Sequence, residues 1–193
     1  MERLISKLTA SGILAISCGL AFAGPDDGAF SPAQIAADYV REAAGADAAF
    51  LAAGLLKPAF RQEDLSTLVR FPTDEIAVVS LTGAKIRAAL ERSVALYPSP
   101  SDSFLQLSNI VATFAKSGSP DSRLRSITLG GGPLDDARSY SVAMPATLAR
   151  GGLGYFKIWD KTKITKTLTG VTLEAVLSGK SSRESEPRWR VTN

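Results

Sequence analysis

The sequence predicts an α+β domain, in which a mixed sheet with hairpin-connected strands packs against helices. Three observations lead to this fold class. Apolar residues recur at helical spacing in two segments, several short stretches are rich in β-branched residues, and turns containing glycine or proline separate the later strand-like stretches. Helices and hairpins mixed along one chain in this way are typical of α+β domains.

The first 23 residues have the features of a secretory signal peptide. Arg3 and Lys7 give a positively charged start, an apolar stretch follows, and Ala21-Phe22-Ala23 is a small-residue cleavage motif. We therefore expect an exported protein, periplasmic or secreted, whose mature chain is a single domain over residues 24–193. Because the apolar stretch is short and interrupted by Gly and Ser, we expect no transmembrane segment in the mature chain.

The chain contains no histidine and one cysteine, Cys18, which lies inside the signal segment. An acylated Cys18 is the alternative, which would anchor the chain as a lipoprotein and leave the fold unchanged. Without histidine or a mature cysteine, the Ser–His–Asp relay, a thiolate nucleophile and a zinc–sulfur site are excluded. We therefore expect no metal, no cofactor and no catalysis by this chain alone, although carboxylate chemistry and a Ser–Lys pair stay open. The formal net charge of +3, without a basic stripe, argues against a nucleic-acid partner.

The first helix is predicted from its end signals. Ser31 is a good N-cap, Pro32 suits the first helical position, Gln34 can close a capping box, and Gly45 supplies the stop. The apolar residues at helical spacing are Ile35, Tyr39, Val40 and Ala43.

Strands and helices alternate in the next part of the sequence. Residues 48–51 are predicted as a short buried strand, and a brief helix is expected from Glu63 to near Arg70, where a Phe-Pro pair disfavours its continuation. β-branched residues over 76–81 predict a second strand. The helix that follows has its apolar residues on one face: Ile86, Leu90, Val94 and Tyr97.

The remaining sequence is predicted to be mainly strands. Strand-like stretches cover residues 104–115, 124–129 and 140–144, and turns are expected over 117–120 and 130–133.

Four further features complete the chain. Arg123 and Arg125 alternate along a strand and are expected to form a solvated face. Residues 150–155 form a glycine-rich loop, a last helix is predicted over 172–177, and the polar tail carries no predicted element.

Several short motifs follow one another in an order that is more informative than any one of them. They are Ala-Gly-Ala-Asp-Ala-Ala-Phe-Leu (44–51), Phe-Pro (71–72), Ile-Ala-Val-Val-Ser-Leu-Thr-Gly (76–83), Leu-Glu-Arg-Ser (90–93), Phe-Leu-Gln-Leu-Ser (104–108), Gly-Gly-Pro-Leu-Asp (131–135), Tyr-Ser-Val-Ala (140–143) and Gly-Gly-Leu-Gly-Tyr (151–155). In this order they closely resemble the C-terminal domain of the 5′-nucleotidase family, from before residue 35 to about residue 160.

The resemblance implies a division of labour. In that family an N-terminal metallophosphoesterase domain holds two metal ions and performs the hydrolysis, and the C-terminal domain binds the nucleotide, stacking its base between two aromatic rings. The resemblance therefore implies a 5′-nucleotidase C-terminal-like domain standing alone, because the mature residues before the match are too few to hold the metallophosphoesterase domain.

The family's binding motifs are altered in this sequence. Its Asn-x-Gly-Gly-x-Arg loop resembles residues 52–57, where Lys57 replaces the Arg and loses the bidentate fork that suits a phosphate. The stacking phenylalanines correspond to Pro72, beside Phe71, and to Thr147, and the Asp of Gly-Gly-Asp-Gly corresponds to Leu153. Since stacking is worth about 1–3 kcal/mol per base, the resemblance implies a degenerate site.

Six residues remain as candidates for ligand binding, and most have a simpler explanation. Lys57 either contacts an anion or is solvated, and Phe71 either offers a ring or packs in the core. The glycines either cradle a phosphate or form a tight loop with positive φ. The six candidates are Lys57, Phe71, Arg150, Gly151, Gly152 and Tyr155.

Two functions are consistent with this sequence. The first is an exported non-catalytic binding module that recognises a nucleotide-like small molecule or a protein partner. The second is the substrate-binding half of a split hydrolase, acting in nucleotide catabolism with a separate exported metallophosphoesterase chain. The loss of the Asn, the Arg, the Asp and both rings favours the first.

Overall fold

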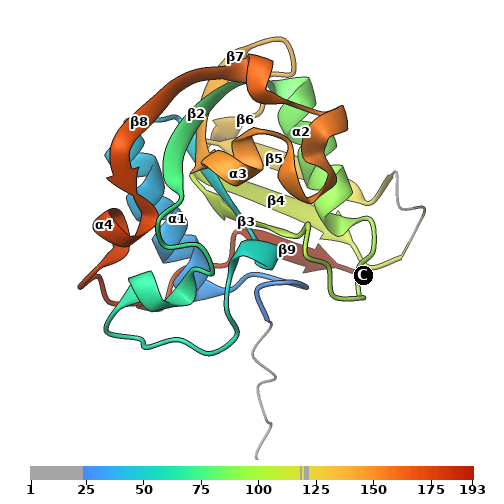
Figure 1. The fold of residues 1–193 in the computed structure, drawn as a ribbon. Coiled ribbons are helices and arrows are strands. Elements are labelled where there is room, and N and C mark those ends of the chain that lie inside the picture. Colours follow the sequence, from blue (N-terminus) through green and yellow to red (C-terminus); the bar gives the residue numbers. More distant parts are fainter. Residues whose placement is uncertain (1–23, 118, 120–121) are drawn as a thin grey trace, which may run out of the picture.

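The structure, a computed structural model, describes residues 24–117, 119 and 122–193, which form two β-sheets with helices on both sides of the larger one (Figure 1). The predicted signal segment, residues 1–23, and part of the turn predicted over 117–120 lie outside the described residues. The predicted α+β class is confirmed. Among the described residues, no helix is long and apolar enough to cross a membrane.

Both sheets are mixed. The larger sheet has the order β3-β1-β7-β2-β8, in which β1 and β7 are parallel and the other neighbouring strands are antiparallel. Its strands are β1 (Ala48–Ala52), β2 (Glu75–Thr82), β3 (Leu105–Ser108), β7 (Ser139–Pro145) and β8 (Ile164–Thr172). In the smaller sheet, of order β6-β5-β4-β9, the pair β4 and β9 is parallel; its strands are β4 (Ile110–Ala115), β5 (Leu124–Leu129), β6 (Gly132–Pro133) and β9 (Trp189–Thr192).

The prediction of one strand over residues 104–115 was wrong because Asn109 divides it into β3 and β4, which lie in different sheets. Asn109 has a φ of 59°, in the left-handed region that asparagine tolerates better than most residues, and its Nδ2 donates to the Asp47 carbonyl at 2.8 Å. The chain therefore leaves the larger sheet after β3 and enters the smaller sheet as β4.

Two apolar clusters flank the larger sheet. On one side, α1 (Ser31–Ala44) and α4 (Leu173–Leu177) cover it, and on the other lie α2 (Gly83–Val94) and the smaller sheet (Figure 1). The side chains of β1 alternate between them, since Phe50 packs in the cluster with α2 and Leu51 in the cluster with α1. Both faces of the sheet are therefore dry at β1, which explains why β1 has no polar residue.

The helices after α1 lie near their predicted positions, but α2 ends at Val94, so Tyr97, predicted on its apolar face, lies beyond the helix. The brief helix is a 3₁₀ turn over Leu65–Leu68 that Asp64 caps, α2 begins after Thr82, whose hydroxyl accepts from the Lys85 amide at 3.4 Å, and α4 begins after Thr172. The turn predicted over 130–133 connects β5 to β6, with Gly130 and Gly131 at positive φ.

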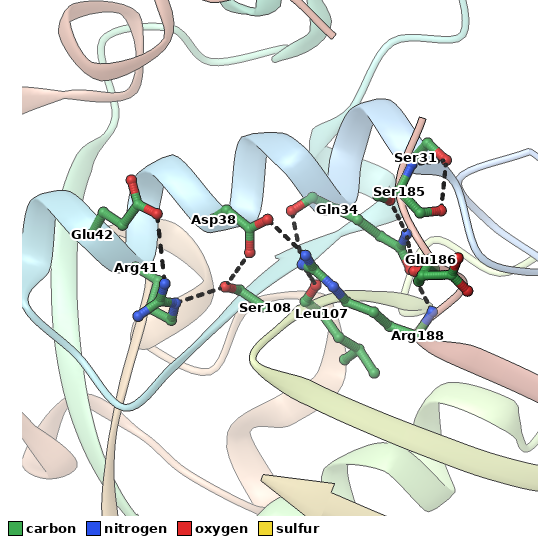
Figure 2. A network of polar contacts seen from close by, with 10 residues as sticks. All are labelled: Ser31, Gln34, Asp38, Arg41, Glu42, Leu107, Ser108, Ser185, Glu186 and Arg188. Atoms are coloured by element: carbon green, nitrogen blue, oxygen red, sulfur yellow. Dashed lines mark hydrogen bonds and ion pairs between the residues drawn. The ribbon is translucent and has the colours of Figure 1, made fainter. Parts of the chain in front are cut away.

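The start of α1 differs from the predicted capping box. Phe30 is the N-cap without a side-chain bond, and Ser31 lies one residue inside the helix. Gln34 is buried, and its Nε2 donates to Ser185 Oγ at 2.7 Å (Figure 2). The C-terminal tail supplies this partner, so tertiary contact replaced the local cap. Ala43, predicted on the apolar face, is exposed.

The C-terminal part contains two strands that the sequence did not predict, β8 and β9. β8 is an edge strand with four threonines in nine residues, and because none of its side chains is fully buried, it lacks the burial alternation of a half-buried strand. In β9, Trp189 is buried against Phe104 and Phe114, and its Nε1 donates to the Leu105 carbonyl at 2.7 Å.

Arg123 does not belong to a solvated face as predicted. It is half-buried, and its Nη1 donates to the Val94 carbonyl at 3.0 Å and to the Tyr97 carbonyl, so it closes the C-terminal end of α2. Arg125 is exposed.

Candidate ligand-binding face

The loop that contains Lys57 lies beside the segment that leads to Phe71. The Lys57 amide donates to the Leu68 carbonyl at 2.7 Å, and the Arg70 amide donates to the Leu55 carbonyl at 2.9 Å. These reciprocal bonds make a short antiparallel contact, although the two loops are separated by ten residues or more. Lys57 and Phe71 are both exposed.

Asp74 connects the Phe71 turn to the next loop. One oxygen of its carboxylate accepts from the Thr147 amide at 3.1 Å, at the start of α3 (Ala146–Ala149). Gly152 packs against the same helix so closely that an added Cβ would lie 2.6 Å from the Thr147 carbonyl oxygen. The Phe71 turn, α3 and the glycine-rich loop are thus contiguous, and we call residues 54–57, 71–74 and 150–156 the three-loop face.

The glycine-rich loop is a candidate site, and it also needs its glycines for its backbone conformation and close packing. Gly151 and Gly154 have φ values of 88° and 82°, and Leu153, which is not glycine, has 55°. A Cβ at Gly151 would lie 2.7 Å from the Phe156 Cα. Arg92 on α2 holds the loop by donating to the Leu153 carbonyl at 3.0 Å. Gly151 is buried, and its role in ligand binding stays a prediction.

Tyr155 is a core residue. Its ring is fully buried, stacked on Trp159 with centroids 4.5 Å apart, and Arg92 lies over it. Its hydroxyl donates to the Ser103 carbonyl at 2.5 Å, and burial raises the pKa of this phenol. Tyr155 therefore offers no exposed surface in this structure, and its role in ligand binding stays a prediction.

Two aromatic rings are exposed on the three-loop face instead. Phe71 is 53% exposed and Phe156, which the sequence analysis did not single out, is 63% exposed. Phe156 lies in the 3₁₀ turn Gly152–Lys157, directly after the buried Tyr155. The sequence shows that Tyr155 and Phe156 are adjacent aromatic residues, but only the path of the turn determines which of the two rings faces the core.

The altered positions of the family's motifs also lie here. Thr147 is exposed, and Pro72 and Leu153 are half-buried, so the face lacks the ring at each stacking position and the carboxylate. Lys57 and Arg150 are exposed and bring two positive charges. In the described part of the chain, no group of three or more His, Cys, Asp or Glu side chains could hold a metal ion.

Comparisons with known proteins agree with the observed fold. The family model of the 5′-nucleotidase C-terminal domain matches residues 29–161. The fold is similar to that of the 5′-nucleotidase precursor of Thermus thermophilus, with 22% identity and a TM-score of 0.68, over 84% of this chain and 35% of that one. It is also similar to the NAD nucleotidase of Haemophilus influenzae, with 14% identity and a TM-score of 0.60, over 89% of this chain and 37% of that one. A third similar structure is a putative 5′-nucleotidase from Staphylococcus aureus, solved in complex with alpha-ketoglutarate. It has 16% identity and a TM-score of 0.58, over 87% of this chain and 40% of that one. No curated protein matched the sequence.

The fold is thus that of a mixed α+β domain similar to the C-terminal domains of 5′-nucleotidases. The chain belongs to the 5′-nucleotidase C-terminal domain family. It spans little more than a third of the length of the Thermus and Haemophilus structures that it matches.

Proposed function

We propose that this chain is an exported, non-catalytic binding module whose three-loop face recognises a nucleotide-like small molecule. The observation that carries the proposal is the pair of exposed rings, Phe71 and Phe156, on contiguous loops. Aromatic faces bind nucleobases by stacking, without needing hydrogen bonds to the base. Lys57 and Arg150 add exposed cations that suit a phosphate group.

The non-catalytic role rests on the sequence. Without histidine and with Cys18 in the proposed signal segment, the usual general base and thiolate nucleophile are missing. Export rests on the signal features of residues 1–23. With Leu153 at the position of the family's Asp, the face is also expected to bind weakly and with little specificity.

A second candidate is the substrate-binding half of a split nucleotide hydrolase. The matched nucleotidase structures are more than twice as long as the part this chain covers, which leaves room for a separate exported metallophosphoesterase chain as partner. Phosphate release from AMP that needs both chains, and that neither gives alone, would support this candidate.

The test is an NMR titration of residues 24–193 with AMP and adenosine. We expect millimolar dissociation constants, about −4 kcal/mol or weaker, because both family rings are replaced. Phe71→Ala and Phe156→Ala should each weaken binding severalfold, whereas Val191→Ala, an exposed apolar residue on β9, should leave it unchanged. Binding that neither ring variant weakens would place the site elsewhere. Metal-dependent phosphate release by the pure chain would overturn the non-catalytic role.

A further inference from the structure

A second groove lies at the far end of β2 from the Phe71 turn. It has a volume of about 360 Å³ and is lined by residues from four segments, among them Ser80, Thr82, Lys85, Ser139, Thr162 and Lys163. The Phe71 turn precedes β2, and Thr82 ends it. At about 3.3 Å per residue, the Phe71 turn and Thr82 are roughly 25 Å apart along the strand. The glycine-rich loop is nearer, because Ile158 of the lining follows the 3₁₀ turn that carries Phe156.

The groove opens because β8 pairs with only part of β2. The last pair is Val79 with Ile164, so the final three residues of β2 extend beyond the start of β8. A register shift lies beside this pair, where the Thr165 hydroxyl donates to the Val78 carbonyl at 3.2 Å. The 3₁₀ turn Lys161–Lys163, capped by Asp160, then forms the opposite wall.

The charged residues that line the groove are all positive. Lys85 and Lys163 bring two ammonium groups, and none of the nine lining residues is Asp or Glu. Among the described residues, neither lysine forms a salt bridge, whereas the neighbouring Arg87 is paired with Asp136 at 2.9 Å.

Helix α2 begins at Gly83, beside the groove, and its first turn has no acidic residue. Asp135 and Asp136 pack against this end, where the Gly83 and Ala84 amides donate to the Arg138 and Asp136 carbonyls. The positive charge of the groove therefore comes from the two lysines. The hydroxyl groups of Thr82, Ser139 and Thr162 add neutral hydrogen-bonding groups from three elements.

We propose that this groove binds a small phosphate-bearing anion, with Lys85 and Lys163 supplying the cations and the surrounding hydroxyls supplying hydrogen bonds. Its volume suits a ligand of that size. The groove shares no lining residue with the three-loop face, although Ile158 lies two residues after Phe156, and the proposal does not depend on the function proposed for that face.

Asp160 is the carboxylate that opposes such a ligand. It accepts from the Thr162 amide at 2.8 Å and from the Thr162 hydroxyl at 2.6 Å, and these hydrogen bonds, with Lys163 and Lys161 nearby, lower its pKa. It is therefore charged at neutral pH, and its removal should strengthen anion binding.

The test is a titration of residues 24–193 with inorganic pyrophosphate in 150 mM NaCl, followed by amide NMR. We expect saturable shifts at Thr82, Ser139 and Thr162. The double variant Lys85→Met/Lys163→Met should weaken binding at least tenfold. Lys166→Met removes the same charge from an exposed position on β8 that does not line the groove, and should change affinity less than threefold.

Asp160→Asn keeps an oxygen acceptor for Thr162 and should tighten binding two- to threefold. All four positions are exposed, so the variants should fold, which circular dichroism checks. Shifts that do not saturate, shifts confined to the three-loop face, or an equal loss in Lys166→Met would each overturn the proposal.

Discussion

Arg188 and Asp38 form an ion pair of 2.6 Å between residues 150 positions apart in the sequence. Arg188 precedes β9, and Asp38 lies in the middle of α1, with the Ser108 hydroxyl donating to its second oxygen at 2.6 Å (Figure 2). Arg188 also donates to the carbonyls of Gln34 and Leu107. The C-terminal tail, which lies beyond the segment matched by the family model, is therefore fastened to the first helix of the domain.

Arg188→Met should destabilise the domain by about 2–3 kcal/mol, because it leaves a largely buried Asp38 carboxylate and two carbonyls without their donor. Urea unfolding of residues 24–193 measures the loss. Arg190→Met, at an exposed neighbour on β9, is the matched control and should cost less than about 0.5 kcal/mol. Equal losses would mean that the network does not stabilise the fold.

Gly151→Ala should cost about 2–5 kcal/mol. Its φ of 88° is unfavourable for alanine, and the new Cβ would lie 2.7 Å from the Phe156 backbone. Gly131→Ala is the control: its φ is 83° and no atom lies within 4 Å of the new Cβ. Only the unfavourable backbone conformation remains, which should cost about 1–2 kcal/mol. Similar midpoints for the two variants in urea would show that the glycine-rich loop relaxes around the added methyl group.

Pro72→Phe with Thr147→Phe should tighten AMP binding tenfold or more, since stacking contributes about 1–3 kcal/mol per base. Pro72 belongs to the three-loop face, and Asp74, two residues later, connects it to Thr147 by accepting from the Thr147 amide. Calorimetry compares the double variant with the parent, and Ser126→Phe on the exposed side of β5 controls for non-specific stacking. An unchanged affinity would mean that the two backbone positions no longer face each other.

Asp47→Asn should lower stability at neutral pH but not in acid. Hydrogen bonds from the amide and the hydroxyl of Ser141, both at 2.8 Å, hold the pKa of Asp47 below its usual value, with Arg138 adding to the effect. A depressed carboxyl pKa stabilises the folded state above the unfolded value, about 3.9, and this contribution disappears as pH falls through the folded value. The difference in melting temperature between parent and variant should therefore be present at pH 7 and narrow below about pH 4. A difference that is constant from pH 7 to pH 2 would argue against the charge as its cause.

Export predicts a processed N-terminus. After expression of the full chain, mass spectrometry should find Gly24 as the first residue, and Ala23→Asp should block the cleavage. An acylated Cys18 at the N-terminus would establish the lipoprotein alternative, and an unprocessed chain in the cytoplasm would contradict both.

Local sequence signals determined much of this fold. Gly45 ends α1 in the left-handed conformation, the β-branched run forms β2, and Thr82 caps α2, because each depends on residues within one or two turns. The order of motifs was enough to identify the family, since motif order reflects the order of elements.

Only the tertiary structure decided the features that depend on distant partners. Gln34, predicted to cap the first helix, instead donates to the C-terminal tail. Tyr155 is buried in the core, whereas Phe156 is exposed. Asn109, with its positive φ, divides the predicted strand between two sheets. A local pattern cannot rank such alternatives, because a polar side chain takes whichever hydrogen-bond partner burial leaves it, and an aromatic ring goes wherever the packed core has room.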